Sequence, residues 1–215
     1  MSAGLIDSTE MYLRTVLELE EEGIPALRAR LAERLGLSAP SVSEGVARLE
    51  KDGWVELSAD RTVRLTAAGR DRAMHVLRKH RLAERLLVDV IGLEPEHVHE
   101  EACRWEHVIS DRVEQKLIEF LGNPTTSPYG NPIDAGASAP LATLAEATTD
   151  RVTIERISEQ LQGNHAVIAA LDATGIAPGV QVRVDRSDGD IVLRAERGSL
   201  AVDGDSARLL YVSEA

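Results

Sequence analysis

This sequence has a single cysteine, no long apolar run and no signal-peptide pattern after Met1. Cys103 is the only cysteine in 215 residues, so the chain forms no intramolecular disulfide. There is no run of about twenty apolar residues, which excludes a membrane-spanning helix. The stretch after Met1 has neither the basic start nor the apolar core of a signal peptide, and we therefore expect a cytoplasmic protein that does not bind membranes.

Common catalytic motifs are also missing. The sequence contains no His-Glu-x-x-His pair, no Gly-x-Ser-x-Gly elbow and no phosphate-binding loop. These absences weaken an enzymatic interpretation, and we expect a protein that is not an enzyme.

Charge is distributed unevenly along the chain. The formal net charge is -12 at pH 7, which by itself disfavours a polyanionic partner. Residues 26–81 nevertheless carry twelve Lys or Arg against seven Asp or Glu, a net of +5, so the other segments together carry -17. This basic block is either a solvated helical face or a surface that contacts nucleic-acid phosphates, and charge alone leaves both interpretations open.

The first 65 residues predict two short helices joined by a tight turn, preceded by another helix and followed by a two-stranded wing. The expected segments are 7–23, 26–35, 38–52, 54–57 and 62–65. Asp7 and Glu10 form a plausible capping box for the first of them. In this arrangement the helix at 38–52 enters the major groove of DNA. Because such helix pairs also occur in proteins that bind other proteins, the pattern favours DNA binding without requiring it.

Short hydroxyl groups and basic side chains gather on and near this recognition helix. Serine hydroxyls suit phosphate oxygens or base edges, and Arg or Lys side chains neutralise phosphates. The expected DNA-binding residues are Ser8, Arg28, Arg30, Ser38, Pro40, Ser41, Ser43, Glu44, Arg48, Lys51 and Arg61.

The rest of the chain predicts a helical part and then a small β-barrel. One long helix is expected from Thr66 to Ile91 and another from about Pro95 to Leu121, before a Pro- and Gly-containing linker at 125–140. Beyond the linker the expected segments are short helices at 154–161 and 166–173 and alternating runs at 180–184, 191–193, 200–202 and 209–211. The pattern indicates an α+β chain with a domain boundary in the linker.

Three potential metal ligands share one face of the helix expected at 95–121. Cys103, Glu106 and His107 stand at i, i+3 and i+4, so a thiolate, a carboxylate and an imidazole converge. This set suits borderline ions such as Fe(II), Co(II), Ni(II) and Zn(II) and disfavours Mg(II) and Ca(II). The alternative is a buried free cysteine beside a surface ion pair, which the spacing leaves open.

Histidine is concentrated in the same region. Five of the six histidines lie there: His75, His80, His97, His99 and His107. His80 and Glu84 form an i, i+4 pair that His99 could meet from the next helix, which gives a second candidate site of nitrogen and oxygen ligands. The alternative is a set of exposed polar residues on helix surfaces.

Five segments are distinctive enough to compare with known families. They are DSTEMYLRTVLELEEE (7–22), LRARLAERL (27–35), RKHRLAERLL (78–87), VHEEACRWEH (98–107) and SPYGNP (127–132). They closely resemble the diphtheria toxin repressor and iron-dependent regulator family over residues 1–132, and the C-terminal third looks like the family's SH3-like domain. The resemblance implies a winged helix-turn-helix at 1–74, an all-helical metal-binding and dimerisation domain at 75–140, and an SH3-like small β-barrel at 141–215.

The resemblance implies two metal sites per subunit and one anion site. The activating site falls on Met11, Cys103, Glu106 and His107, with the Cys103 carbonyl as a further ligand; the ancillary site falls on His80, Glu84, His99, Glu159 and Gln162; the anion-binding corner falls on Arg81, Ser127 and Asn131. Manganese-selective relatives carry harder oxygen donors in place of Met11 and Cys103, so soft ligands favour Fe(II), while Co, Ni, Mn and Zn are expected to bind in vitro.

The function implied is that of an Fe(II)-activated repressor of metal homeostasis genes, a homodimer that binds operator DNA with one or two dimers on each operator. The nearest alternative is a manganese-responsive repressor of the same family. A redox sensor at Cys103 would respond to peroxide and not to chelator. A metal-dependent hydrolase would need a general base that the sequence does not offer.

Glu44 departs from the family pattern. Iron-dependent relatives usually carry glutamine at this point of the recognition helix. A carboxylate accepts a hydrogen bond from cytosine N4 and repels phosphates, so we hypothesise an altered base preference.

Overall fold

The N-terminal unit of the computed structural model is a winged helix-turn-helix. The structure describes residues 8–134, 141–187 and 190–214. The unit contains α1 (Ser8–Glu21), α2 (Arg28–Leu35), α3 (Ala39–Lys51), β1 (Val55–Leu57) and β2 (Val63–Leu65), with β1 and β2 antiparallel. Gly36 ends α2 at φ +63°, and the Ser38 hydroxyl accepts a hydrogen bond from Ser41 N at the start of α3. The predicted elements are confirmed, although Asp7 of the expected capping box lies outside the described residues.

The helical unit contains one helix more than the sequence predicts. It consists of α4 (Ala67–Arg85), a π-helical turn (Leu86–Ile91) ended by Gly92, α5 (Pro95–Trp105) and α6 (Asp111–Phe120). The single helix expected at 95–121 is therefore wrong. The Ser110 hydroxyl accepts from Val113 N and caps a new helix, so the chain turns between Glu106 and Ser110.

The C-terminal unit is a six-stranded antiparallel sheet with short helices. Its elements are β3 (Ala142–Thr143), β4 (Arg151–Ile157), α7 (Glu159–Gln162), α8 (His165–Thr174), β5 (Gln181–Ser187), β6 (Asp190–Ala195), β7 (Gly198–Val202), α9 (Gly204–Ala207) and β8 (Leu210–Glu214). The strand order is β3-β8-β4-β5-β6-β7. The helix expected at 154–161 is wrong in its first half, because Val152, Ile154 and Ile157 belong to β4 and point into the core.

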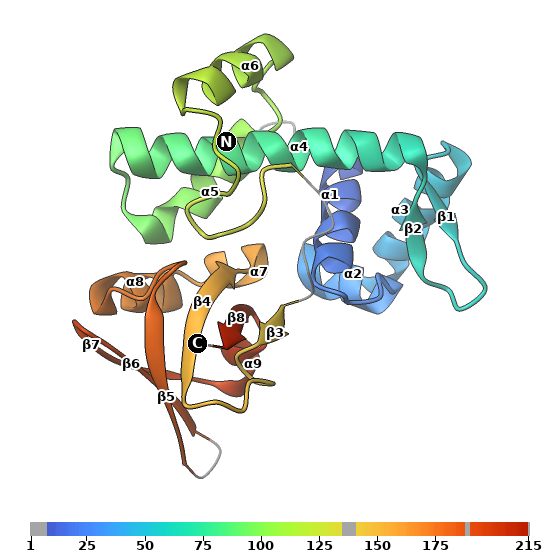
Figure 1. Cartoon of the computed structure of the whole chain (residues 1–215). Helices are drawn as coiled ribbons and strands as arrows, with labels where there is room; N and C mark the ends of the chain where they lie inside the picture. The colour runs from blue at the N-terminus through green and yellow to red at the C-terminus, as the bar shows by residue number, and fades with distance from the viewer. Residues whose placement is uncertain (1–7, 135–140, 188–189, 215) are drawn as a thin grey trace.

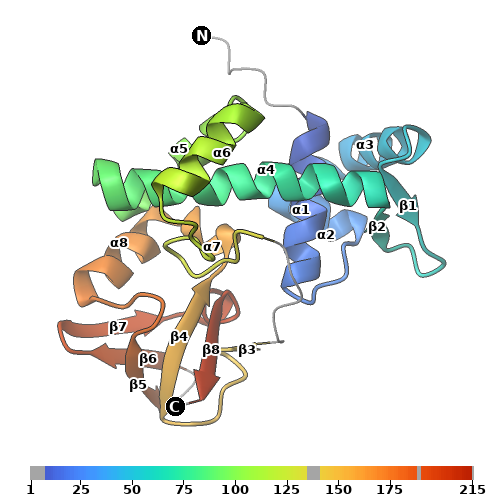
Figure 2. The same ribbon diagram turned by 45° about the horizontal axis from the view of Figure 1, so that its top comes forward.

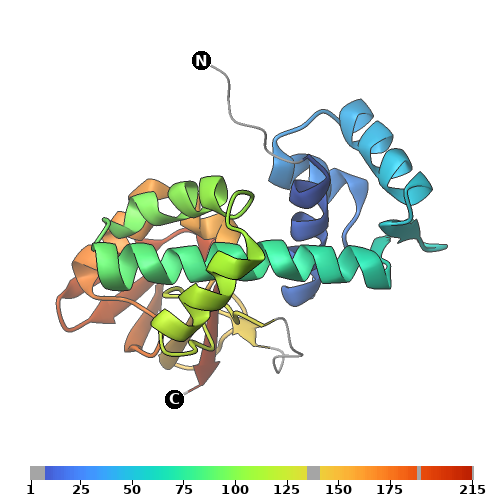
Figure 3. The ribbon, with the colours of Figure 1, turned by 90° about the horizontal axis from the view of Figure 1, so that it is seen from above.

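Helix α4 connects the three units. The winged helix-turn-helix packs near its N-terminal end, while α5, α6 and the C-terminal unit gather around its other half (Figures 1 and 3). Helices α7 and α8 lie between the sheet and the α4–α5 pair (Figure 2). Ala83, Leu87 and Val98 of the helical unit share one hydrophobic core with the sheet, so these two units pack as one body.

The segment expected to be a linker is packed over its described part. Thr126 and Pro132 form an isolated β-bridge, and Tyr129 is buried against Pro95, whose carbonyl accepts from the tyrosine hydroxyl at 2.7 Å. Residues 135–140 of the predicted linker lie outside the described residues. Among the described residues, none of the helices has the length and apolar character needed to cross a membrane.

Candidate metal centre and DNA-binding face

Helices α4 and α5 bring three potential ligands together in the interior. His80 and Glu84 lie one turn apart on α4, and His99 and Cys103 lie one turn apart on α5. The ligand atoms of His80, His99 and Cys103 all lie within 4.8 Å of one another. The alternative of exposed polar residues on helix surfaces is therefore wrong for His80 and Glu84, both of which are fully buried.

The two metal sites predicted from the sequence are joined in this structure. His80 Nε2 lies 2.9 Å from Glu84 Oε1, and His80 Nδ1 lies 2.7 Å from Glu106 Oε2. Cys103 Sγ lies 3.6 Å from His99 Nε2. Cys103 and Glu106, expected in the activating site, thus contact His80 and His99, expected in the ancillary site.

His107 approaches the cluster from the turn after α5, and not from the helix itself. The shared helical face predicted for Cys103, Glu106 and His107 is therefore only partly formed, since Glu106 is the C-cap residue of α5. His107 Nδ1 lies 2.6 Å from Glu10 Oε2, and His107 Nε2 lies 3.2 Å from Glu106 Oε1. Met11 follows Glu10 on α1 and is half-buried.

Arg14 is a residue of this cluster that the sequence reasoning missed. Its Nη1 donates to Glu106 Oε2 at 2.6 Å and to Cys103 Sγ at 3.4 Å, and its Nε donates to Glu18 Oε1 at 2.5 Å. The available signal was spacing, because Arg14 lies at i+3 from Met11 and therefore on the same face of α1.

The electrostatics of the cluster favour the ionised forms of Cys103, Glu84 and Glu106 and the protonated form of His99. Burial opposes ionisation of Cys103, but Arg14 and His80 outweigh it and lower the thiol pKa to about 4. Burial likewise opposes the charge on Glu84 and Glu106, yet His80 beside Glu84 and Arg14 beside Glu106 lower each pKa to about 2. Despite its burial, His99 has a pKa raised to about 9 by its contacts with Cys103 and Glu84.

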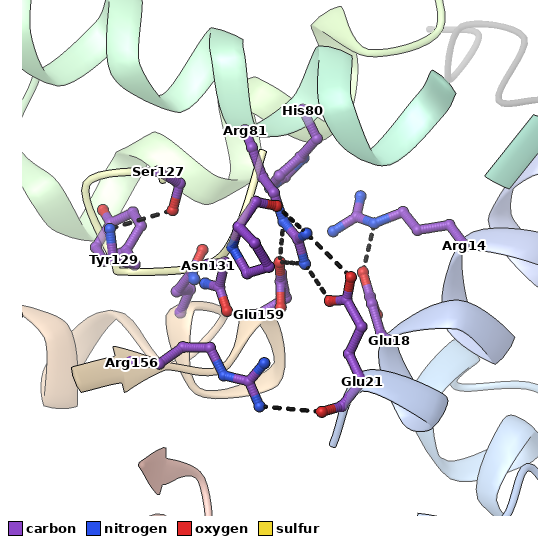
Figure 4. Close-up of polar contacts among 12 residues, drawn as sticks. Arg14, Glu18, Glu21, His80, Arg81, Ser127, Tyr129, Asn131, Arg156 and Glu159 are labelled. Atoms are coloured by element: carbon purple, nitrogen blue, oxygen red, sulfur yellow. Dashed lines mark hydrogen bonds and ion pairs between the residues drawn. The ribbon is translucent and has the colours of Figure 1, made fainter. Parts of the chain in front are cut away.

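The residues expected from the C-terminal unit lie beside the cluster and bind other partners. Arg81 Nε and Nη2 donate to Glu159 Oε1 at 2.9 and 2.8 Å, and Nη2 also donates to Glu21 Oε2 at 2.6 Å (Figure 4). Gln162 Nε2 donates to the Ile157 carbonyl at 3.0 Å. Glu159 is therefore held by Arg81 and does not contact His80, Glu84 or His99 through any hydrogen bond in the described part of the chain.

The expected anion-binding corner lies at the same junction. Ser127 Oγ accepts from Tyr129 N at 3.2 Å, and Asn131 Nδ2 donates to the Ile157 carbonyl at 2.8 Å. The Arg81 guanidinium at this corner is paired with two carboxylates of the protein itself, those of Glu159 and Glu21 (Figure 4).

Several buried ligand atoms lack a hydrogen-bond partner among the described residues. They are Glu84 Oε2, His99 Nδ1, Glu106 Oε1, His107 Nε2 and Gln162 Oε1; of these, Glu106 Oε1 and His107 Nε2 lie 3.2 Å apart without hydrogen-bond geometry. Buried polar atoms are almost always paired in native proteins, so this concentration in one place requires an explanation. Sulfur, nitrogen and oxygen donors with unused capacity fit a borderline divalent ion.

The DNA-binding residues expected from the sequence lie on the exposed side of the winged unit. Ten of the eleven are exposed, and Arg28 is half-buried. Arg48 Nη2 donates to Ser8 Oγ at 3.3 Å, which connects α3 to the start of α1. Arg61 lies in the wing turn at φ +66°. Helix α3 and the wing project from the end of the molecule opposite the C-terminal unit (Figure 1).

The fold and the cluster define a class of protein in which a DNA-binding winged helix is joined to a helical domain with a candidate metal site. Three sequence profiles match the chain: "Iron dependent repressor, N-terminal DNA binding domain" at residues 4–63, "Iron dependent repressor, metal binding and dimerisation domain" at 66–135, and "FeoA domain" at 140–214. The chain belongs to the iron-dependent repressor family, as the resemblance predicted.

Relatives of known name support this assignment over nearly the whole chain. The "Iron-dependent repressor IdeR" of Mycobacterium leprae is 49% identical over 205 residues, 88% of this chain and 89% of the relative. The "Diphtheria toxin repressor" of Corynebacterium glutamicum is 45% identical and covers 98% of this chain and 97% of its own.

Solved structures agree with the fold. A "Manganese-dependent transcriptional repressor complex with manganese" matches with a TM-score of 0.82 at 29% identity, covering 95% of this chain and 98% of its own. T. acidophilum IdeR matches with a TM-score of 0.77 at 27% identity, covering 95% and 96%.

Proposed function

We propose that this chain is an Fe(II)-activated transcriptional repressor that binds operator DNA as a homodimer and controls metal homeostasis genes. The observation that carries the proposal is the contact between the cluster and helix α1 of the DNA-binding unit. Glu10 of α1 binds His107, and Arg14 of α1 binds Cys103 and Glu106. Metal binding in the cluster would therefore change the contacts of α1, and the recognition helix α3 packs against α1.

We assign two metal sites to each subunit. The activating site consists of Met11, Cys103, Glu106 and His107, and the ancillary site consists of His80, Glu84, His99, Glu159 and Gln162. Four of the unpartnered atoms on the shared boundary, Glu84 Oε2, His99 Nδ1, Glu106 Oε1 and His107 Nε2, support this assignment. If Glu159 leaves Arg81 to bind metal at the ancillary site, Nε of Arg81 loses its acceptor and can bind an external anion together with Ser127 and Asn131, while Glu21 stays paired with the other side of the guanidinium.

Ligands from two domains explain activation. When bound, the ion supplies positive charge and a cross-link between α1 and α5. Met11 belongs to α1, whereas Cys103 belongs to α5. An ion bound to both residues would therefore fix the position of α1 against the helical unit. In a dimer this favours one spacing of the two α3 helices, which must reach major grooves about 34 Å apart.

Iron is the proposed physiological metal and manganese the second candidate. The thioether of Met11 and the thiolate of Cys103 are soft donors, which suit Fe(II) better than Mn(II). Manganese-dependent repressors with the same fold are the observation that favours the second candidate.

The remaining assignments follow from the same proposal. The DNA-binding domain spans 1–74, the metal-binding and dimerisation domain 75–140 and the SH3-like domain 141–215. The eleven residues of the exposed face contact the operator, one or two dimers bind each operator, the protein acts in the cytoplasm, and it catalyses no reaction.

Anaerobic operator binding at fixed salt tests the function. Fe(II), Mn(II) and Zn(II) are titrated separately, and a chelator then removes the metal. We expect binding with Fe(II) at the lowest concentration and full reversal by the chelator. Because coupling is reciprocal, operator DNA should raise metal affinity by the same factor, about 5- to 150-fold. Metal-free protein that binds the operator as tightly as the loaded form refutes the proposal.

A further inference from the structure

Arg14 places a positive charge where two of the proposed metal ligands meet. The side chain is 4% exposed, and Nη1 donates both to Glu106 Oε2 at 2.6 Å and to Cys103 Sγ at 3.4 Å. These are the carboxylate and the thiolate assigned to the activating site. A metal ion bound there would use lone pairs of the same two groups, so Arg14 and the ion compete for them.

The other edge of the guanidinium has a separate partner. Arg14 Nε donates to Glu18 Oε1 at 2.5 Å, and Glu18 is buried one turn further along α1. Glu18 is not among the proposed metal ligands. A guanidinium released from Cys103 and Glu106 therefore keeps an anionic partner on its own helix, and no unpaired charge is left in the interior.

We propose that Arg14 is a built-in competitor for the activating metal site, which binds Cys103 and Glu106 in the metal-free protein and retains only Glu18 when metal binds. This inference rests on the proposed function and names a residue that sets the metal concentration at which the repressor responds. Arg14 stabilises the metal-free arrangement, and any such stabilisation lowers the apparent affinity for the ion.

The direction in which an Arg14 substitution changes metal affinity distinguishes a competitor from a residue with a purely structural role. If Arg14 competes, its removal destabilises the metal-free state more than the loaded state and tightens metal binding. If Arg14 only holds α1 in place, its removal loosens the site and weakens metal binding. Removal of Glu18 takes away the second partner, so metal binding then weakens.

Anaerobic Co(II) titration of the full chain measures the effect. Cys103 is the only thiol, so the thiolate-to-cobalt charge-transfer band reports this site alone. We expect Arg14→Gln to bind Co(II) at least about tenfold more tightly than wild type and Glu18→Gln to bind it more weakly. Arg34→Gln is the matched control, because Arg34 forms a buried ion pair with Glu22, just after α1, and none with the cluster among the described residues. It should leave Co(II) affinity unchanged.

The outcomes separate the inference from the proposed function. Wild-type protein that binds no Co(II) in equilibrium dialysis contradicts the metal function itself, whereas wild-type protein that binds Co(II) without the charge-transfer band overturns Cys103 as a thiolate ligand and with it the competitor role. Wild-type protein that binds Co(II), together with an Arg14→Gln variant that binds it equally or more weakly, overturns only the competitor role. If Arg14→Gln does not fold without metal, Arg14→Lys decides: the ammonium lacks the guanidinium fork, so tighter binding than wild type supports the role and equal or weaker binding overturns it.

Discussion

Glu10 on α1 binds His107 after α5 through a hydrogen bond of 2.6 Å between Oε2 and Nδ1. A neutral ring that donates from Nδ1 to Glu10 carries its lone pair on Nε2, which is buried and lies 3.2 Å from Glu106 Oε1 without hydrogen-bond geometry. Metal-binding histidines usually donate the second ring N–H to a carboxylate, which fixes the ring and its tautomer. Glu10 therefore orients His107 for metal binding.

Glu10→Ala should weaken metal binding by about 10- to 100-fold, because the His107 ring then loses its orientation. Competition of the metal-loaded protein with a chelator of known affinity measures the change. Glu20→Ala is the control, since Glu20 also lies on α1 and pairs with an arginine of α4, Arg70, but does not contact His107. Equal metal affinity in the Glu10→Ala variant and the control contradicts the orienting role.

The sequence predicts local elements well because their signals are local. Gly36 and Gly92 end helices at φ +63° and +73°, and Thr66 caps α4 through the amide of Gly69, as their residue types indicate. The break before α6 was missed because Ser110 offers a cap in the middle of an apolar helical repeat, and periodicity alone does not reveal which signal prevails.

The contacts that build the candidate site are not local. Arg14 and Cys103 are 89 positions apart, and Arg81 and Glu159 are 78 positions apart. From the sequence alone, a charged residue such as Arg14 on an amphipathic helix is expected to be exposed to solvent. Its burial becomes evident only when the packing of α1 is known. The family resemblance predicts which residues are metal ligands. Only the tertiary structure shows that Arg14 contacts these ligands and that Glu159 pairs with Arg81.

Cys103 should be a thiolate in mildly acidic solution. Burial alone would raise its pKa, but Arg14 and His80 lower it to about 4 from an ordinary value of 9.0. Thiolate absorbance in the ultraviolet, recorded on metal-free protein with Cys103→Ser as the blank, should therefore titrate with a midpoint near pH 4. A midpoint at or above pH 8 contradicts the electrostatic description of the cluster.

The same shift determines how stability depends on pH. The pKa of Cys103 is lower in the folded state, so its contribution to the free energy of unfolding is full above about pH 9 and is lost as the pH falls towards 4. Chemical denaturation of metal-free wild type and Cys103→Ser should give a stability difference that changes across this interval. If the difference in the free energy of unfolding between the two proteins stays constant from pH 4 to pH 9, the lowered pKa of Cys103 is contradicted.

Gly45→Ala should impair DNA binding more than metal binding. A Cβ at Gly45 of α3 would lie 2.6 Å from the hydroxyl oxygen and 2.7 Å from Cζ of Tyr12, the residue that follows Met11 on α1. Either the buried Tyr12 ring or the recognition helix must shift to admit the methyl group, at a cost of about 1–3 kcal/mol that outweighs the better helix propensity of alanine. Operator affinity at saturating metal and metal affinity from chelator competition measure the two effects, and an equal loss in both contradicts the prediction. Gly204→Ala, a helical glycine with open space around it, is the control.

Glu44 should influence which bases the recognition helix reads. It is exposed on α3 beside Ser43, and Arg48 lies one turn further along the same helix. A carboxylate in this position accepts from cytosine N4 and repels the phosphates that Arg48 attracts, so it favours some base pairs and weakens general affinity. Glutamine keeps the length of the side chain, removes the charge and can pair with adenine.

Binding-site selection with wild type and Glu44→Gln should therefore return different preferred bases at one position of each half-site. Affinity for unrelated DNA should also increase in the variant, because one repulsive charge near the phosphates is lost. Glu50→Gln removes a charge from another face of α3 and should leave the selected sequence unchanged, which separates base reading from net charge. If wild type and Glu44→Gln select the same operator, Glu44 does not read bases, and its charge acts only on overall affinity.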